Sequence, residues 1–321
     1  MAVGITDIDA NLKPQLSIMI ISESSIKWLP IRKVSDDVSF ETSDAIAIEE
    51  PLEIRLEFGP TGDRKTRNIS VTMRTPGDDK DLATGFLFTE GIINNNKDIL
   101  NVDHVFFACA ENKENVIQVA LKEGVTPQLQ STERNFYTTS SCGVCGKGSI
   151  NAIKTVSVFS NKNETQFAVS ADLLHQLPGI LLQHQAVFSN TGGLHASALF
   201  SKEGELLLVR EDVGRHNALD KLIGSALNNN SLPLSENILL LSGRASFELV
   251  QKAAMAGINI IASVGAPSSL AVELAKEFNI TLVGFLRNQR FNIYSAEQRI
   301  LQSTDENSDQ GQIFYPDLLA K

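Results

Sequence analysis

Alternating apolar and charged residues mark the first regular part of the chain. From Pro51 to Phe58 every second residue is apolar, and charged residues stand between them. This period of two predicts a half-buried strand. A turn at 59–63 and renewed alternation over 69–73 predict a hairpin.

The pattern then changes to helical and back. Pro76 and Gly77 end the hairpin, and a helix is expected from Asp79 or Asp81 to Gly91. Apolar runs at 102–109 and 116–121 predict a second pair of strands.

A further helix is expected to begin at Ser170. Leu173, Leu174 and Leu177 have the spacing of one apolar helix face, and Ser170 is a good N-cap. Pro178-Gly179 is expected to interrupt this helix.

The second half of the chain predicts an α/β domain. Continuous apolar strands are expected at 196–200, 206–210, 238–242, 258–263 and 281–285. Amphipathic helices are expected at 215–227, 246–256 and 268–278. Such alternation indicates a mostly parallel sheet covered by helices on both faces.

Length and pattern together suggest how the chain is divided. With 321 residues, about two domains are expected. The predicted division is a partly irregular N-terminal arm (1–45), a small β-rich lobe (46–134), the main α/β domain (135–297) and a C-terminal tail (298–321).

Composition narrows the class of protein. The formal charge is −10, so an anion site must be a local basic patch, and a nucleic-acid partner is not expected. The chain holds three cysteines, far fewer than a disulfide-built secreted scaffold. Since no apolar run reaches the roughly 18 residues of a membrane helix, we expect a cytoplasmic protein with no membrane partner.

The segment from Cys142 to Cys145 is the strongest candidate for chemistry. Two cysteines lie among glycines at 143, 146 and 148, and Lys147 follows them. A nearby cation lowers the pKa of a thiol and favours the reactive thiolate. The pair could be half of a zinc site, completed by His195, His216 or Cys109, or a thioredoxin-like dithiol. It could also carry sulfur, with a thiolate taking a sulfane sulfur from a donor persulfide.

A second candidate site is basic. These residues follow predicted strands or begin the next helix: Arg210, Arg215, His216, Arg244, Arg287 and Arg290. In a parallel sheet such positions share the carboxyl edge, where ligands bind. Residues 242–290 carry five Lys/Arg against three Glu, a local charge of +2. The alternative is that these arginines pair with Glu211, Asp212 and Glu248. For the set, a phosphate-bearing ligand is the natural expectation.

His195 raises the question of a zinc deaminase. Those enzymes use His-x-Glu followed by Pro-Cys-x-x-Cys. Here Ser197 stands in place of the glutamate, and the cysteine pair precedes the histidine. Deaminase chemistry is therefore not expected.

Taken together, the motifs resemble one known family. They are Ser141–Gly146, Thr191–Ala196, Arg210–Ala218, Ser242–Arg244 and Phe285–Arg290. Their residues and their order resemble the formate dehydrogenase accessory sulfurtransferase family (FdhD), over roughly residues 45–297.

The resemblance implies a function and a set of roles. Its members receive sulfur from a cysteine desulfurase and transfer it to the molybdenum cofactor, bis(molybdopterin guanine dinucleotide), for formate dehydrogenase. By matching motif, Cys142 would carry the persulfide and Cys145 would assist it. The cofactor-binding residues would be Phe285, Leu286, Arg287, Asn288, Gln289 and Arg290, with Arg244, Arg215 and His216.

The resemblance also implies a cytidine-deaminase-like three-layer main domain with a mixed or parallel sheet, and a homodimer. No permanently bound metal is predicted. Two alternatives remain open. One is a chaperone that binds the molybdenum cofactor without catalysis, and the other is a zinc-binding structural module.

Overall fold

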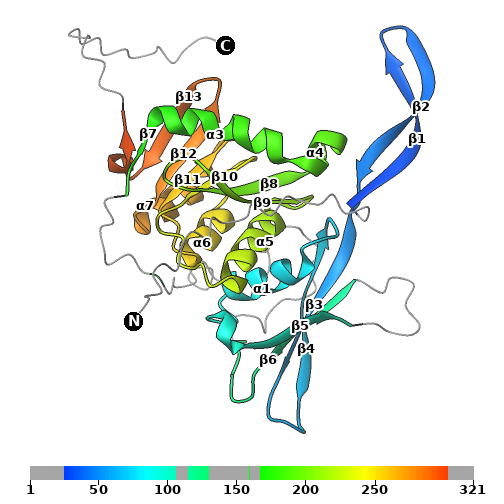
Figure 1. Ribbon diagram of the computed structural model, residues 1–321, viewed down its shortest axis with the longest axis vertical. Coiled ribbons are helices and arrows are strands. Elements are labelled where there is room, and N and C mark those ends of the chain that lie inside the picture. The colour runs from blue at the N-terminus through cyan, green and yellow to red at the C-terminus, as the bar shows by residue number, and fades with distance from the viewer. Residues whose placement is uncertain (1–24, 106–114, 130–158, 160–166, 303–321) are drawn as a thin grey trace, which may run out of the picture.

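Two sheets carry most of the strands (Figure 1). The computed structural model describes residues 25–105, 115–129, 159 and 167–302. Within these residues the larger sheet has six strands in the order β13-β12-β11-β10-β8-β9. They are β8 (His195–Phe200), β9 (Leu206–Asp212), β10 (Ile238–Leu241), β11 (Ile260–Ser263), β12 (Thr281–Arg287) and β13 (Arg290–Ser295).

The larger sheet is mixed, which corrects the expectation of a mostly parallel sheet. β10, β11 and β12 run parallel to one another, but β8 is antiparallel to both of its neighbours and β13 is antiparallel to β12. The five predicted strands of this sheet are confirmed. β13 was not predicted, and only Asn288 and Gln289 separate it from β12.

Helices cover both faces of this sheet, as predicted. On one face lie α3 (Ala171–His184) and α4 (Ala186–Thr191). On the other lie α5 (Arg215–Asn228), α6 (Phe247–Met255) and α7 (Ser269–Glu277) (Figure 1). Successive residues of β10 point to opposite faces: Ile238 and Leu240 join the α3 side of the core, whereas Leu239 and Leu241 join the α5 side.

The predicted break at Pro178 is wrong. α3 continues through Pro178 to His184, and Ser170 caps its start by accepting a hydrogen bond from the Leu173 N–H at 3.2 Å. Leu174, Leu177 and Leu181 all pack into the core below the helix. Burial of this continuous apolar face outweighs the roughly 3 kcal/mol cost of a proline inside a helix.

The smaller sheet lies beyond α5 (Figure 1). Within the described residues its order is β4-β3-β6-β5. Its strands are β3 (Glu50–Phe58), β4 (Lys65–Arg74), β5 (Ile99–His104, preceded by the 3₁₀ turn η2, Asn96–Asp98) and β6 (Val116–Leu121). The predicted hairpin and the predicted strand pair are confirmed. Residues 106–109 of the strand predicted at 102–109 lie outside the described residues.

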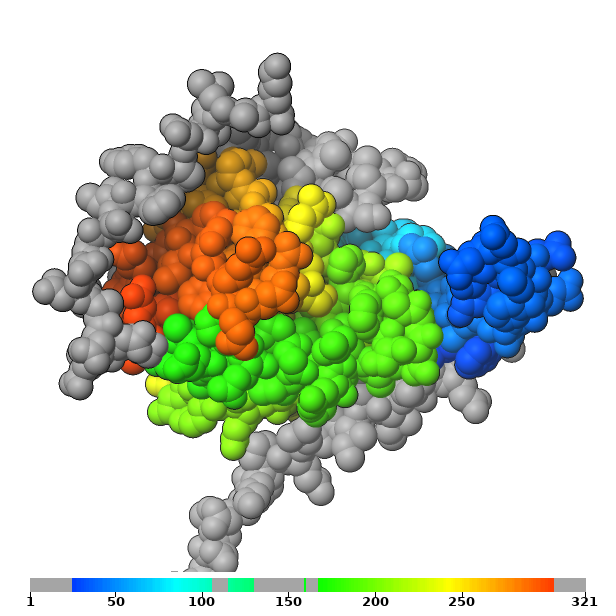
Figure 2. Space-filling model, turned by 90° about the horizontal axis from the view of Figure 1, so that it is seen from above, coloured from blue at the N-terminus to red at the C-terminus, as the bar shows by residue number. Residues whose placement is uncertain are grey.

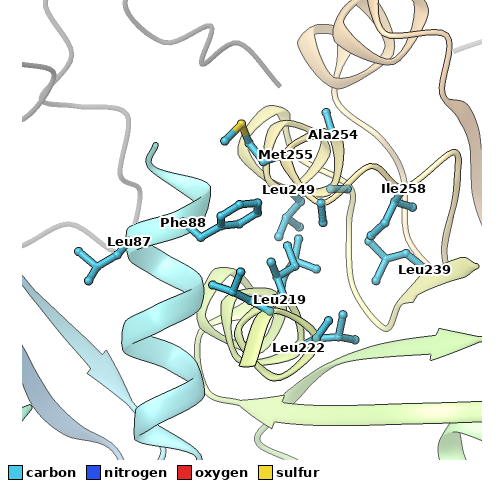
Figure 3. Packing of buried hydrophobic residues seen from close by; sticks show 14 of the residues in the cluster. Leu87, Phe88, Leu219, Leu222, Leu239, Leu249, Ala254, Met255 and Ile258 are labelled. Carbon is cyan, nitrogen blue, oxygen red and sulfur yellow. The ribbon is translucent and has the colours of Figure 1, made fainter. Parts of the chain in front are cut away.

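Helix α1 (Asp79–Thr89) joins the two sheets through one continuous core. Figure 3 shows Phe88 of α1 pointing towards Leu249 and Met255 of α6, while Leu87 points to the opposite side of α1. The same cluster includes buried side chains of β3 and β6. The two sheets are therefore held by shared burial rather than by a flexible linker.

A separate hairpin stands out from the body (Figure 2). β1 (Ile26–Ser35) and β2 (Val38–Ala47) pair along their whole length, within the segment that was expected to be a partly irregular arm. Most of its side chains are exposed, and Trp28 is 66% exposed. The absence of a clear period in this sequence follows from the lack of a buried face.

A short pair of strands closes the described chain. β7 (Val169–Ser170) runs parallel to β14 (Ile300–Leu301), which follows the 3₁₀ turn η3 (Glu297–Arg299). Among the described helices none combines the length and apolar character needed to cross a membrane. The domain boundaries at 45, 134 and 297 and the deaminase-like description stay predictions.

Candidate functional site

One edge of the larger sheet gathers most of the residues expected in the basic site. β10, β11 and β12 end there, and so does β9, while the antiparallel β8 begins there with His195. Arg215 and His216 start α5 directly after β9, and Arg244 follows β10. The predicted convergence at one edge is therefore confirmed for these positions.

The loops at this edge are tied to one another beyond the ends of the strands. The Gly265 N–H donates to the Gly243 carbonyl, and the Phe285 N–H donates to the Gly265 carbonyl, both at 3.0 Å. The backbones approach closely: a Cβ on Gly284 would lie 2.7 Å from Cδ of Pro267. Glycines are required here because any side chain would push the loops apart.

Asp212 organises the loop that presents Arg215 and His216. This fully buried carboxylate accepts from the Gly214 N–H at 2.8 Å and pairs with the Lys221 ammonium at 2.7 Å. The ion pair is buried between β9 and α5, so it fixes where α5 begins.

His195 lies at this edge in β8, between β10 and β9. Its position in β8 pairs with Asp212, and a Cβ on Gly243 would lie 3.2 Å from its Nδ1. Burial is the main cause that lowers the pKa of His195. Arg215 and His216 also lower it, whereas the Asp212 carboxylate raises it. His195 is therefore a neutral imidazole at pH 7.

A second polar cluster lies beside it at the start of α6. Nε2 of His216 is 3.3 Å from Ser246 Oγ and 3.8 Å from Glu248 Oε2. The His216 imidazole is the main reason that the pKa of Glu248 falls to about 2, although burial opposes it. Glu248 is therefore an anion that orients His216, whereas the alternative drawn from the sequence was that it pairs with an arginine.

The predicted segment 285–290 is divided between core and surface. Leu286 is fully buried in the core on the α3 side, and Phe285 is half-buried at a positive φ of 57°. Asn288 and Gln289 form the tip of the β12–β13 hairpin, also at positive φ. Only the exposed end of the segment can therefore meet a ligand without rearrangement.

Arg287 and Arg290 are directly opposite each other across this tip. Like charges facing each other on a hairpin are unfavourable. Among the described residues, neither these two arginines nor Arg244 or Arg215 forms an ion pair with a carboxylate. These four cations are available to an anion.

Arg210 does not belong to this group. It lies within β9, where it bonds to Asp81 of α1 at 2.9 Å and to Ser225 Oγ at 3.0 Å. Its role is to hold α1 against the larger sheet. Likewise Lys252, counted in the local charge of +2, is buried with Asp220 at 2.9 Å.

A pocket of about 530 Å³ opens beside the basic edge, on the α3 side of the sheet. Its walls are mostly apolar, from Pro178, Leu181, Leu182, Phe188, Leu194 and Val264. Its polar lining includes Gln185, His195 and Ser242. Ser242 is held in place because its Oγ accepts the Ala196 N–H at 2.8 Å. Such a pocket suits a flat, uncharged ring.

Ser242 belongs to a motif already singled out in the sequence, but sequence reasoning missed Gln185 and Phe188 as lining residues, and it placed Glu211 only as a possible partner of arginine. Their roles depend on how α4 folds back over β8 and β9. The Gly192-Gly193 pair before His195 is the one signal in the sequence, since it marks the tight turn between α4 and β8.

The cysteine segment predicted to carry the chemistry is not among the described residues. Cys142, Cys145, Lys147 and Cys109 lie outside the described residues. Their predicted roles stay predictions. Among the described residues no group of three His, Cys, Asp or Glu is arranged to hold a metal ion.

Comparison with known proteins gives consistent matches over most of the chain. The model of the FdhD/NarQ family matches residues 47–301. A sulfur carrier protein FdhD from Streptomyces coelicolor is 49% identical over 270 residues, which are 84% of this chain and 93% of that protein. A sulfur carrier protein FdhD from Saccharolobus solfataricus is 39% identical over 86% of this chain and 98% of its own.

A solved structure is also similar. The crystal structure of a Desulfotalea psychrophila protein described as a formate dehydrogenase accessory protein superposes with a TM-score of 0.64 and 25% identity. The match covers 86% of this chain and 99% of that one. These findings confirm the resemblance drawn from the motifs.

Proposed function

Because the chain belongs to the FdhD/NarQ family, we propose that it is a sulfur carrier that serves the maturation of formate dehydrogenase. In this proposal it acts as a sulfurtransferase between a cysteine desulfurase and the molybdenum cofactor, bis(molybdopterin guanine dinucleotide). The carrier role is supported by the relatives named sulfur carrier protein FdhD. The desulfurase and the molybdenum cofactor are proposed as partners because the motifs resemble those of the family.

The proposed sulfur-bearing residue is Cys142. Its thiolate attacks the outer sulfur of the desulfurase persulfide, and the desulfurase cysteine leaves as a thiolate. Cys142 then holds the outer sulfur as a persulfide. When that sulfur passes to the acceptor, Cys142 returns as a thiolate and the metal centre of the acceptor supplies the two electrons that make a sulfide ligand. Cys145 is proposed to assist this exchange.

The proposed acceptor site is the basic edge of the larger sheet with its neighbouring pocket. The observation that carries it is that Arg287 and Arg290 lie opposite each other and form no ion pair with a carboxylate of the described residues, so an anion would neutralise two like charges. Arg244 and Arg215 lie at the same edge, and His216 lies beside them. Arginines bind phosphate through paired N–H groups, so the four suit the phosphates of a guanine dinucleotide. A planar ring of the same molecule would enter the apolar pocket.

Mass spectrometry tests the carrier step directly. After incubation with a cysteine desulfurase and cysteine, the protein should gain about 32 Da, the mass of one sulfur, on Cys142. The matched variants are Cys142→Ala and Cys145→Ala. The first should lose the adduct, and the second should keep it if Cys145 only assists.

Complementation separates this proposal from a chaperone that binds the cofactor without catalysis. In cells that lack the protein, Cys142→Ala should not restore formate dehydrogenase activity. Full activity of that variant would rule out sulfur carriage and favour the chaperone. Metal analysis tests the other alternative. About one zinc ion per chain, lost in Cys142→Ala and in Cys145→Ala, would favour a structural zinc module instead.

A further inference from the structure

Glu211 is a buried carboxylate with an unusual set of partners. It lies near the end of β9 with 2% of its surface exposed. Its Oε2 accepts the Val187 N–H and its Oε1 accepts the Phe188 N–H, both at 3.0 Å. Among the described residues it forms no ion pair, because Lys221, which approaches from α5, binds Asp212.

Those two N–H groups belong to the first turn of α4. The first N–H groups of a helix have no partner within the helix, so a carboxylate placed there satisfies them and is attracted by the helix dipole. The residue before α4, Gln185, is buried, but its side chain accepts no N–H of the helix. The cap is thus supplied by another element, from 23 and 24 residues away.

α4 needs such support because of its length. It has six residues, too few for a helix that is stable by itself. It also packs against β2 of the projecting hairpin. The position of α4 over the sheet therefore depends on contacts with neighbouring elements. One of these contacts is with the charged side chain of Glu211.

The same short helix forms one wall of the apolar pocket. Phe188 of α4 and Gln185 before it line the pocket, and the chain after α4 lines it again at Gly192–His195. A small shift of α4 would change the width of the space that receives the ring.

From these contacts we infer that Glu211 is a positioning residue: it holds α4 as the wall of the pocket and so sets the affinity for the planar heterocycle of the acceptor. This inference rests on the proposed function, which assigns the acceptor to this edge. The ring that enters the pocket is a purine or a pterin, because the proposed acceptor contains one of each and both are planar heterocycles.

The inference is tested with guanosine diphosphate (GDP) and neopterin as separate probes for the two rings, using calorimetry on the full chain. In Glu211→Gln one oxygen is replaced by an NH₂ group, which cannot accept an N–H. Loss of one charge-assisted hydrogen bond should weaken binding of the probe that enters the pocket by roughly tenfold at pH 7.5. The control is Asp79→Asn, which changes another buried carboxylate, one that pairs with Arg74. This variant should bind the probe with the affinity of the wild type.

A pH profile distinguishes positioning from simple loss of stability. Burial raises the pKa of Glu211, so affinity of the wild type should fall as the pH is lowered and the carboxylate is protonated. Glu211→Gln should lack the part of this pH dependence that comes from protonation of Glu211. The other titratable or charged groups near Glu211 are His195 of β8, Asp212 of β9 and Lys221 of α5, which both proteins share, and residues 186–191 of α4 carry none.

Hydrogen exchange supplies a readout that needs no ligand. The amides of Val187 and Phe188 should be protected in the wild type and should exchange faster in Glu211→Gln, while amides of α5 stay unchanged. If Glu211→Gln does not fold, two measurements on the wild type replace it. Probe affinity and the protection of the Val187 and Phe188 amides should both fall as the pH is lowered.

Each outcome decides a different point. Binding that Glu211→Gln retains at wild-type strength overturns the inference and leaves the proposed function standing. If neither probe binds the wild type, the acceptor site is wrong and the inference falls with it. The test of sulfur on Cys142 is independent of both.

Discussion

Gly85 of α1 and Gly224 of α5 meet where the two helices cross, and neither has room for a side chain. A Cβ on Gly85 would lie 1.9 Å from the Asp220 carbonyl oxygen, and one on Gly224 would lie 1.9 Å from the Asp81 carbonyl oxygen. The backbones are therefore in direct contact at the junction between the two sheets.

Replacing Gly85 by Ala should force the helices apart. Because the clash is with backbone, which cannot turn aside, we expect the free energy of unfolding to fall by about 3 kcal/mol. Urea denaturation measures this. The matched control is Gly179→Ala in α3, where nothing lies within 4 Å of an added Cβ, and it should be neutral or slightly stabilising. Equal stability of the two variants would contradict the close crossing.

Removing Asp220 should cost more than removing its whole ion pair. Burial raises the pKa of Asp220 against the attraction of Lys252, and Lys252 is itself buried. Asp220→Ala leaves this ammonium buried without its main partner, at a cost of about 3–5 kcal/mol. The double variant Asp220→Leu with Lys252→Met removes both charges and should be more stable than the single one. Thermal and urea unfolding of the three proteins would test the order.

His195 should titrate below its ordinary range. Burial lowers its pKa from 6.5, and Arg215 adds to the effect, so NMR should show a neutral ring at pH 7. The unfolded chain takes up this proton more readily. Stability from this group is therefore present above pH 6.5 and is lost as the pH falls through the lowered pKa. Arg215→Gln should raise the pKa, whereas Arg32→Gln on the projecting hairpin should leave it unchanged.

Arg287 and Arg290 should matter for binding of phosphates and not for folding. Changing either to Gln should weaken GDP binding by roughly tenfold, and the remaining affinity should depend less on salt. Without ligand, the double variant should be at least as stable as the wild type, because a like-charge contact is removed. Lys202→Gln, on the β8–β9 turn at the opposite end of the sheet, is the control. Unchanged GDP affinity in both arginine variants would argue against the basic edge.

Trp28 is the only tryptophan in the chain, so its fluorescence reports on the projecting hairpin. With 66% of its surface exposed, it should emit like tryptophan in water and be readily quenched by iodide. A blue-shifted, unquenched emission from the isolated protein would mean that this face of the hairpin is covered in solution.

Much of the fold could be predicted from local pattern. Strands and helices of the second half follow from the period of burial, which is a property of neighbouring residues. The same reasoning failed at Pro178, where contacts of α3 with the sheet outweigh a local signal, and on the projecting hairpin, which has no buried face to leave a period.

The sequence by itself determined the order of the elements, the family motifs and the clustering of arginines after strands. Only the tertiary structure decided which of these charges pair with carboxylates of the described residues. Arg210 and Arg244 follow the same rule in the sequence, but Arg210 is bonded to Asp81, 129 residues away, while Arg244 is exposed. Glu211 likewise became a cap for α4 through contacts across more than 20 residues. Such pairings depend on how layers pack, and burial then sets their strength, so they cannot be deduced from spacing along the chain.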